Sequence, residues 1–105
     1  MQTALDAISE PRRREILRLV RDEERPAGWI AAQFPDVSRP TVSQHLRVLG
    51  DAGLLHQRRD GTRRLYRVRS EGLNEVRAFL EEFWDVRLRN LKTEVEAEHR
   101  RRGGR

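Results

Sequence analysis

The chain has 105 residues, which is the length of a single domain, and its formal net charge is +5. Hydrophobic residues make up 36% and charged residues 37%, a ratio that predicts burial of some apolar surface against a second subunit. The absence of cysteine excludes disulfides, thiolate metal sites and cysteine nucleophiles. We see no basic stretch followed by an apolar run at the start and no apolar run of membrane-spanning length, so we expect a soluble cytoplasmic protein without a signal peptide.

The positive charge is concentrated in one segment. Residues 39–69 hold eight arginines and two acids, whereas the rest of the chain has a slight acidic excess. A GC-rich genome would explain why Lys92 is the only lysine, but it would not explain where the arginines lie. Clustering of this kind is typical of a protein that binds a polyanion.

The first part of the chain predicts three short helices. Apolar residues three apart indicate a helix around residues 5–8. A second helix begins near Ser9 or Glu10, because Pro11 is tolerated in a first turn, where its missing N–H would have no partner anyway. Its apolar stripe consists of Ile16, Leu19 and Val20. Residues 27–34 form the third helix.

A fourth helix follows a tight turn at residues 35–37. Ser38 is a good N-cap for it, and Pro40 lies in its first turn. The helix extends to about Asp51, and its inward positions are Val42, Leu46 and Leu49. Gly53 ends it, as a glycine in the left-handed conformation would.

A β-hairpin and a long helix complete the chain. Strands at 54–59 and 63–69 are joined around Asp60-Gly61-Thr62, since Asp-Gly is a strong hairpin signal. Ser70 then caps a helix over about 71–98, whose apolar positions recur every three or four residues. We expect residues 1–99 to form one domain and residues 100–105 a disordered basic tail.

The order of these elements predicts the fold class. Two helices joined by a tight turn and followed by a hairpin are the winged helix-turn-helix arrangement. The predicted protein is mainly α-helical, with a small β-hairpin and a long C-terminal dimerisation helix.

The outer side of the fourth helix carries the residues with which we expect it to bind DNA. A helix fits the major groove, where Gln44 can make two hydrogen bonds to adenine and an arginine can read guanine or hold a phosphate. An ordinary amphipathic surface helix is the alternative. The candidate residues on this helix, which spans about 38–50, are Ser38, Arg39, Pro40, Thr41, Ser43, Gln44 and Arg47.

The tip of the hairpin, residues 58–64, is here called the basic wing. Arg58, Arg59, Arg63 and Arg64 flank its short turn, and their mutual repulsion is costly unless a polyanion is present. We therefore expect the basic wing to contact phosphates or the minor groove. The alternative is a solvated edge hairpin whose charges prevent aggregation.

These segments together resemble a known family. Residues 38–49, followed by Ala52-Gly53-Leu54-Leu55, resemble the core signature of the ArsR-type bacterial repressors. Residues 9–17 are similar to that family's first-helix motif, and the hairpin with Gly61, Arg64 and Tyr66 also matches. The resemblance covers about residues 4–95. It implies a homodimer that places two recognition helices in successive major grooves of a palindromic operator and represses by blocking a promoter.

The resemblance also assigns base-reading positions, which fall on Arg39, Pro40, Ser43 and Gln44. Pro40 departs from the more usual small polar residue. A proline there leaves only an apolar contact with a thymine methyl group.

The dimer is implied to form through the first and last helices. Packing of the long helix on its own domain is one alternative, and a ligand pocket lined by Phe83 and Trp84 between subunits is another. The candidate dimerisation residues are Leu5, Ile8, Leu73, Val76, Leu80, Phe83, Trp84, Leu88 and Leu91.

Many relatives sense metals, but this sequence has no cysteine, and Asp85-Val86-Arg87 stands where a metal-binding relative shows Asp-x-His. We therefore expect the non-metal-sensing branch of the family, with no metal and no cofactor. His45 is expected to be packed or hydrogen-bonded, and His56 to lie on a strand surface. No phosphate loop or Ser-His-Asp grouping is present, so we expect no catalytic residue and no enzyme activity.

Two other functions remain open. Winged helices also serve as interaction modules that bind proteins or RNA, although such a module would not need this concentration of arginine. A ligand- or metal-responsive sensor of the same family is the other alternative, and the small-molecule effector is unknown.

Overall fold

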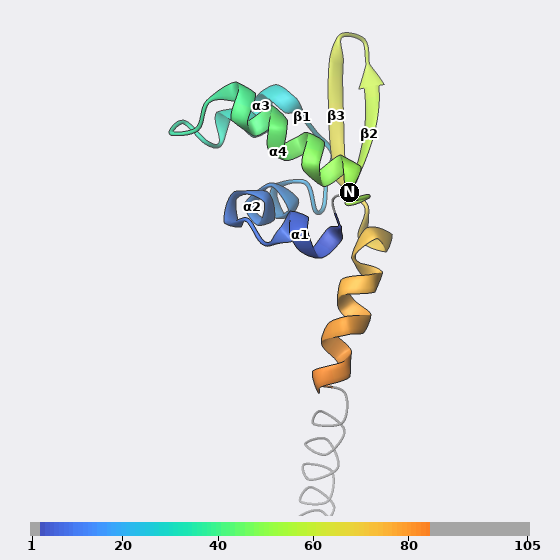
Figure 1. Ribbon diagram of the computed structural model, residues 1–105. Helices are drawn as coiled ribbons and strands as arrows, with labels where there is room; N and C mark the ends of the chain where they lie inside the picture. Colours follow the sequence, from blue (N-terminus) through green and yellow to red (C-terminus); the bar gives the residue numbers. More distant parts are fainter. Residues whose placement is uncertain (1–2, 85–105) are drawn as a thin grey trace, which may run out of the picture. The chain divides into compact units, whose positions relative to one another are not determined.

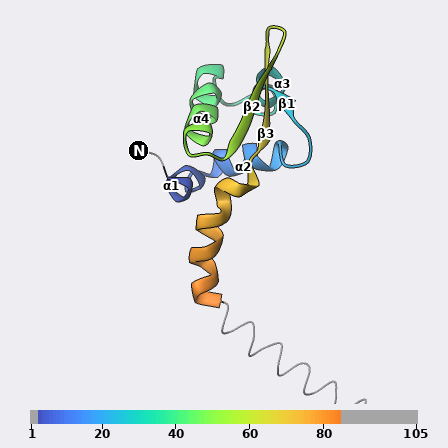
Figure 2. The ribbon, with the colours of Figure 1, turned by 90° about the vertical axis from the view of Figure 1, so that its right-hand side faces the viewer.

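The computed structural model describes residues 3–84 (Figures 1 and 2), which fall into one compact unit up to Asn74 and a second from Glu75 onward. Residues 74–84 are helical. The elements before them are α1 (Ala4–Ile8), α2 (Pro11–Leu19), β1 (Arg25–Pro26), α3 (Ala27–Ala32), α4 (Arg39–Asp51), β2 (Leu55–Asp60), β3 (Arg63–Val68) and the 3-10 helix η1 (Ser70–Leu73).

Side-chain caps fix where the helices begin. The Glu10 carboxylate accepts a hydrogen bond from the Arg13 N–H at 3.1 Å, which confirms the predicted start of α2. The Ser38 hydroxyl oxygen accepts one from the Thr41 N–H at 3.3 Å, as predicted for α4. Each cap satisfies a donor that has no partner within the helix. Gly53 has a φ of 76°, so the predicted left-handed glycine at the end of α4 is confirmed as well.

The sheet has three antiparallel strands in the order β1-β3-β2. Leu55 lies opposite Val68 and Asp60 lies opposite Arg63, so only Gly61 and Thr62 remain for the turn. Gly61 has a φ of 64°, which a glycine at the first turn position of a tight hairpin adopts at little cost. The sequence did not predict β1. Its Pro26 cannot donate to a ladder, which suits an edge strand.

The core of the first unit lies between the helices and the sheet. Val42, Leu46 and Leu49 of α4 are 0–3% exposed, so the predicted inward face of this helix is confirmed. Apolar side chains from α1, α2, α3 and the hairpin are also buried, and the completely inaccessible residues outside α4 are Ala7, Ile16, Val20, Ile30 and Leu54. This core holds α4 against the sheet and leaves its opposite side in solvent.

The segment after β3 differs from the prediction. Ser70 does not cap a long helix, because residues 70–73 form a 3-10 turn and the Ser70 hydroxyl instead donates to the Glu71 carboxylate at 3.3 Å. The α-helix begins at residue 74. The predicted continuation to residue 98 and the tail at 100–105 lie outside the described residues. None of the helices within residues 3–84 has the length and apolar character needed to cross a membrane.

The arrangement is a mainly helical winged helix-turn-helix fold, as predicted. Helices α3 and α4 are joined by a short turn, and the β2–β3 hairpin follows directly. Figures 1 and 2 show that the turn of this hairpin projects beyond the helices, which places its arginines in solvent.

Candidate nucleic-acid interface

Helix α4 presents its predicted DNA-binding residues to solvent. Its cap and first turn are exposed, and so are the more distal positions on the side opposite the core. The structure therefore brings onto one accessible surface the residues Ser38, Arg39, Pro40, Thr41, Ser43, Gln44 and Arg47. Polar side chains and an open helix N-terminus on the same surface are suited to reading bases and contacting phosphates.

The turn before α4 is tied to α2. The Arg12 guanidinium donates to both carboxylate oxygens of Asp36, one of them at 3.3 Å, and it lies 5.5 Å from the centre of the Phe34 ring. The hydrogen bond from Arg12 holds the pKa of Asp36 below its ordinary value. This ion pair connects α2 with the turn that precedes α4.

His45 lies on the inner flank of α4 and is packed there, as predicted. Its side chain is 14% exposed, and its Nδ1 atom lies 3.4 Å from an Arg13 guanidinium nitrogen. Arg13 also donates to the Ala7 carbonyl at 2.6 Å, so it links α1, α2 and α4. His56 is exposed on β2, which confirms the second histidine prediction.

The four arginines of the basic wing are all exposed, but the strand register divides them between two faces of the hairpin. Residues directly opposite each other in an antiparallel pair share a face. Arg59 is opposite Arg64, whereas Arg58 is opposite Leu65 and Arg63 is opposite Asp60. Arg59 and Arg64 therefore share one face, and Arg58 and Arg63 lie on the other.

Among residues 3–84, acidic partners occur on only one of these faces. The Arg58 Nε atom lies 3.0 Å from each Glu24 carboxylate oxygen, and this contact lowers the pKa of Glu24 and raises that of Arg58. The Nη2 atom of Arg63 donates to the Asp60 Oδ2 atom at 3.3 Å. Within the part of the chain that the structure describes, no acidic side chain forms an ion pair with Arg39, Arg47, Arg59 or Arg64. Sequence reasoning missed Glu24, because nothing local marks a pair separated by 34 positions.

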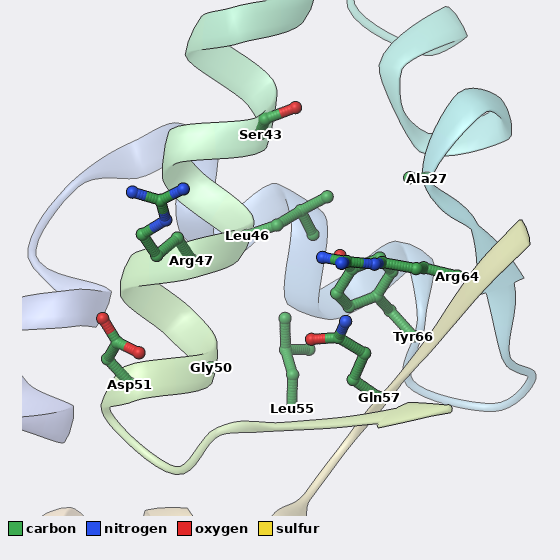
Figure 3. Close-up of a pocket in the computed structure, with 10 residues that line it drawn as sticks. All are labelled: Ala27, Ser43, Leu46, Arg47, Gly50, Asp51, Leu55, Gln57, Arg64 and Tyr66. Carbon is green, nitrogen blue, oxygen red and sulfur yellow. The ribbon is translucent and has the colours of Figure 1, made fainter. Parts of the chain in front are cut away.

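A groove of about 500 Å³ separates α4 from the hairpin (Figure 3). Gln57 and Arg64 extend from the hairpin toward α4, and Leu46 points toward them from the helix. Leu46, Leu55 and Tyr66 supply the apolar part of its wall. The polar or small residues along it are Ala27, Ser43, Arg47, Gly50, Asp51, Gln57 and Arg64. Gln57 was not among the predicted site residues.

The predicted dimerisation residues include several exposed apolar side chains. Leu5 on α1 is 52% exposed. In the helical stretch 74–84, the exposed fractions are 37% for Leu80, 65% for Phe83 and 51% for Trp84. Ile8 and Leu73 are half-buried and Val76 is buried, whereas Leu88 and Leu91 lie outside the described residues.

Phe79 joins the exposed apolar residues of this stretch, although it was not predicted. It is 46% exposed and packs edge to face on Phe83, with 5.1 Å between the ring centres. Within residues 3–84, no three His, Asp or Glu side chains are grouped so that they could hold a metal ion. The Asp85-Val86-Arg87 segment lies outside those residues.

Comparison with known proteins identifies the relatives. A family model described as a helix-turn-helix domain matches residues 8–58. The chain is 37% identical over 95 residues to the HTH-type transcriptional regulator Rv2034 of Mycobacterium tuberculosis, covering 90% of this chain and 88% of the relative. It is 33% identical over 76 residues to the arsenical resistance operon repressor of Staphylococcus xylosus, covering 72% of each.

Solved structures of similar fold are also described as transcriptional regulators. A possible transcriptional regulator for arsenical resistance has a TM-score of 0.70 at 41% identity, covering 86% of this chain and 93% of that one. The homodimeric winged helix-turn-helix DNA-binding domain of a possible ArsR-family regulator from Mycobacterium bovis has a TM-score of 0.58 at 33% identity, covering 75% of this chain and 72% of that one. The chain belongs to the ArsR family of DNA-binding winged helix-turn-helix transcriptional regulators, which are not enzymes.

Proposed function

We propose that the chain is a dimeric repressor that binds a palindromic operator and excludes transcription from the promoter that contains it. The observation that carries this proposal is the exposed surface of α4, whose candidate base-reading side chains lie beside a hairpin rich in arginine. The C2 symmetry of a dimer would present two such surfaces to two half-sites. A repressor bound over a promoter acts by steric exclusion and needs no further chemistry.

The residues of α4 divide between reading and positioning. Arg39, Ser43 and Gln44 contact base edges in this proposal, and Pro40 contacts a thymine methyl group. Ser38 and Thr41, at the N-terminus of the helix, position the protein on phosphates, as does Arg47. Of these residues, Gln44 is expected to give the strongest sequence preference, because its amide can donate to and accept from one adenine at the same time.

The dimer is supported by the exposed apolar residues. Leu5 on α1 and the aromatic side chains of residues 79–84 would be costly to leave in water, and a second copy would cover them. The homodimeric state named for the Mycobacterium bovis relative is consistent with this arrangement. The terminal helices are the proposed dimerisation elements.

We also place the chain in the non-metal-sensing branch of its family, acting in the cytoplasm where chromosomal DNA is accessible. The sequence offers no thiolate, and Arg87 occupies the position of a histidine ligand in metal-binding relatives. Equilibrium dialysis with zinc at neutral pH tests this assignment. Stoichiometric binding that also changes operator affinity would refute it.

The central test is fluorescence anisotropy with duplexes that tile the promoter region of the protein's own gene. We expect one palindromic duplex to bind far more tightly than a scrambled duplex of the same composition. Its affinity should fall steeply as salt rises, because bound arginines release counterions from DNA. Equal, salt-independent binding to all duplexes would rule out the proposed function.

A further inference from the structure

We propose that one sugar–phosphate strand of the bound duplex lies along the groove between α4 and the hairpin, held by Arg64, Arg59 and Gln57. On this view Arg58 and Arg63 stabilise the hairpin itself and do not hold DNA. The inference rests on the proposed function, since it assumes that α4 lies in the major groove. It divides the four wing arginines and adds a contact residue that the sequence did not single out.

The two faces of the hairpin differ in their surroundings. Gln57 lies opposite Tyr66, and Arg59 lies opposite Arg64. Gln57, Arg64 and Tyr66 all line the groove, so their shared face is turned toward α4. By the register, the Arg59 side chain belongs to this same face, further along the strand toward the turn.

The opposite face is already occupied by a carboxylate. Glu24 lies two residues before Pro26, and Leu65 is opposite both Pro26 and Arg58. The Glu24–Arg58 pair therefore spans the three strands on the side of Leu65, which is 6% exposed. A phosphate brought to Arg58 would meet the negative charge of Glu24, which weakens any contact there.

The walls of the groove favour a phosphate strand. Ser43 lines it from α4, and Gln57 and Arg64 line it from the hairpin, so hydroxyl, amide and guanidinium donors are present along its walls. Asp51, in the last turn of α4, is the one acid among the residues that line it. The N-terminal part of the groove, beside Ser43, is therefore free of lining carboxylates.

The geometry of the duplex places a sugar–phosphate strand beside the hairpin when α4 occupies the major groove. A major groove and the minor groove next to it are separated by a single sugar–phosphate strand. A protein with α4 in the first groove and the turn of its hairpin at the second must have that strand between them. Arg64 and Gln57 are then placed to donate to its phosphate oxygens, which positions the protein without reading sequence.

The test compares arginines on the two faces. We expect Arg64→Gln to weaken binding to the operator duplex and to a scrambled duplex by a similar factor. It should also reduce the slope of log affinity against log salt by about 0.9, the value for one lost phosphate contact. Arg59→Gln should do the same. Arg58→Gln is the matched control from the other face, and it should leave the slope unchanged, as should Glu24→Gln.

Two further variants separate charge from structure. Arg64→Lys keeps the cation and should retain the full salt slope, although binding is weaker because the planar guanidinium is lost. Gln57→Leu should weaken binding severalfold with no change of slope, because a neutral donor releases no counterion. Thermal unfolding of each variant checks that the hairpin still folds.

The outcomes are distinguishable from failure of the proposed function. In one outcome, wild-type protein binds one duplex tightly, but Arg58→Gln reduces the slope of log affinity against log salt as much as Arg64→Gln does. That result would support the proposed function and would show that this inference is wrong. An unchanged slope for Arg64→Gln would refute it equally. If wild-type protein shows no salt-dependent binding to any duplex, the proposed function is wrong, and the inference that rests on it is wrong as well.

Discussion

Gly72 in η1 lies against the backbone of Gly53 at the end of α4. A Cβ atom built on Gly72 would lie 2.1 Å from the Gly53 carbonyl oxygen and 2.8 Å from its carbonyl carbon. Next to this contact, the Arg69 N–H donates to the Leu54 carbonyl at 2.8 Å. The end of α4 and the end of the sheet are thereby joined by close backbone packing that only a residue without a side chain permits.

Gly72→Ala is expected to destabilise the protein by about 1–3 kcal/mol, because backbone must shift to admit the methyl group. The matched control is Gly50→Ala in α4, where a Cβ meets nothing within 4 Å. That substitution should stabilise by roughly 0.5–1 kcal/mol, since alanine is the better helix former. Urea denaturation measures both. Equal effects at the two glycines would contradict the close contact.

Gln44→Ala is expected to cost about 1–3 kcal/mol of binding free energy at the operator and little on a scrambled duplex, because a base contact is lost. Anisotropy titrations with the two duplexes give the difference. Gln33→Ala is the control, since Gln33 is exposed at the end of α3 and its amide donates to the Trp29 carbonyl. A loss of the same size on both duplexes would assign Gln44 to the backbone instead of the bases.

Phe83→Asp is expected to produce monomers, and Leu80→Asp should do the same. Both side chains are exposed in the single chain, so an acid there disturbs the fold little but opposes burial against a second copy. Light scattering coupled to size-exclusion chromatography gives the mass. Asn74→Asp adds the same charge at an exposed polar position and should remain dimeric. Unchanged mass for both apolar variants would contradict the proposed interface.

We expect the Arg12–Asp36 pair to make the stability of the protein depend on pH in the acid range. The pKa of Asp36 is lowered from its ordinary value of 3.8, chiefly by the hydrogen bond from Arg12. Its contribution to stability is therefore present above that value and is lost as the pH falls through the lowered pKa. Asp36→Asn and Arg12→Met should each melt with less change in Tm between neutral pH and pH about 3 than wild type. An unchanged pH profile in both variants would show that the pair contributes nothing.

Much of the fold could be predicted because its signals are local. The start of α2 near Glu10, the cap at Ser38, the left-handed Gly53 and the turn at Gly61 each depend on the conformation of a few neighbouring residues. The buried stripe of α4 follows from helical periodicity in the same way. The exposed outer side of α4, which carries most of the candidate site, could therefore be predicted from the sequence.

What the sequence by itself determined about this protein is the succession of helices and strands, together with the basic residues that α4 and the hairpin expose. Tertiary structure alone decided that β1 completes the sheet, that Glu24 holds Arg58, and that Gln57 and Arg64 line the groove. The physical reason is distance along the chain. Contacts such as Glu24–Arg58, 34 positions apart, form only when packing of the core brings separate elements together, and no periodicity or turn signal encodes them.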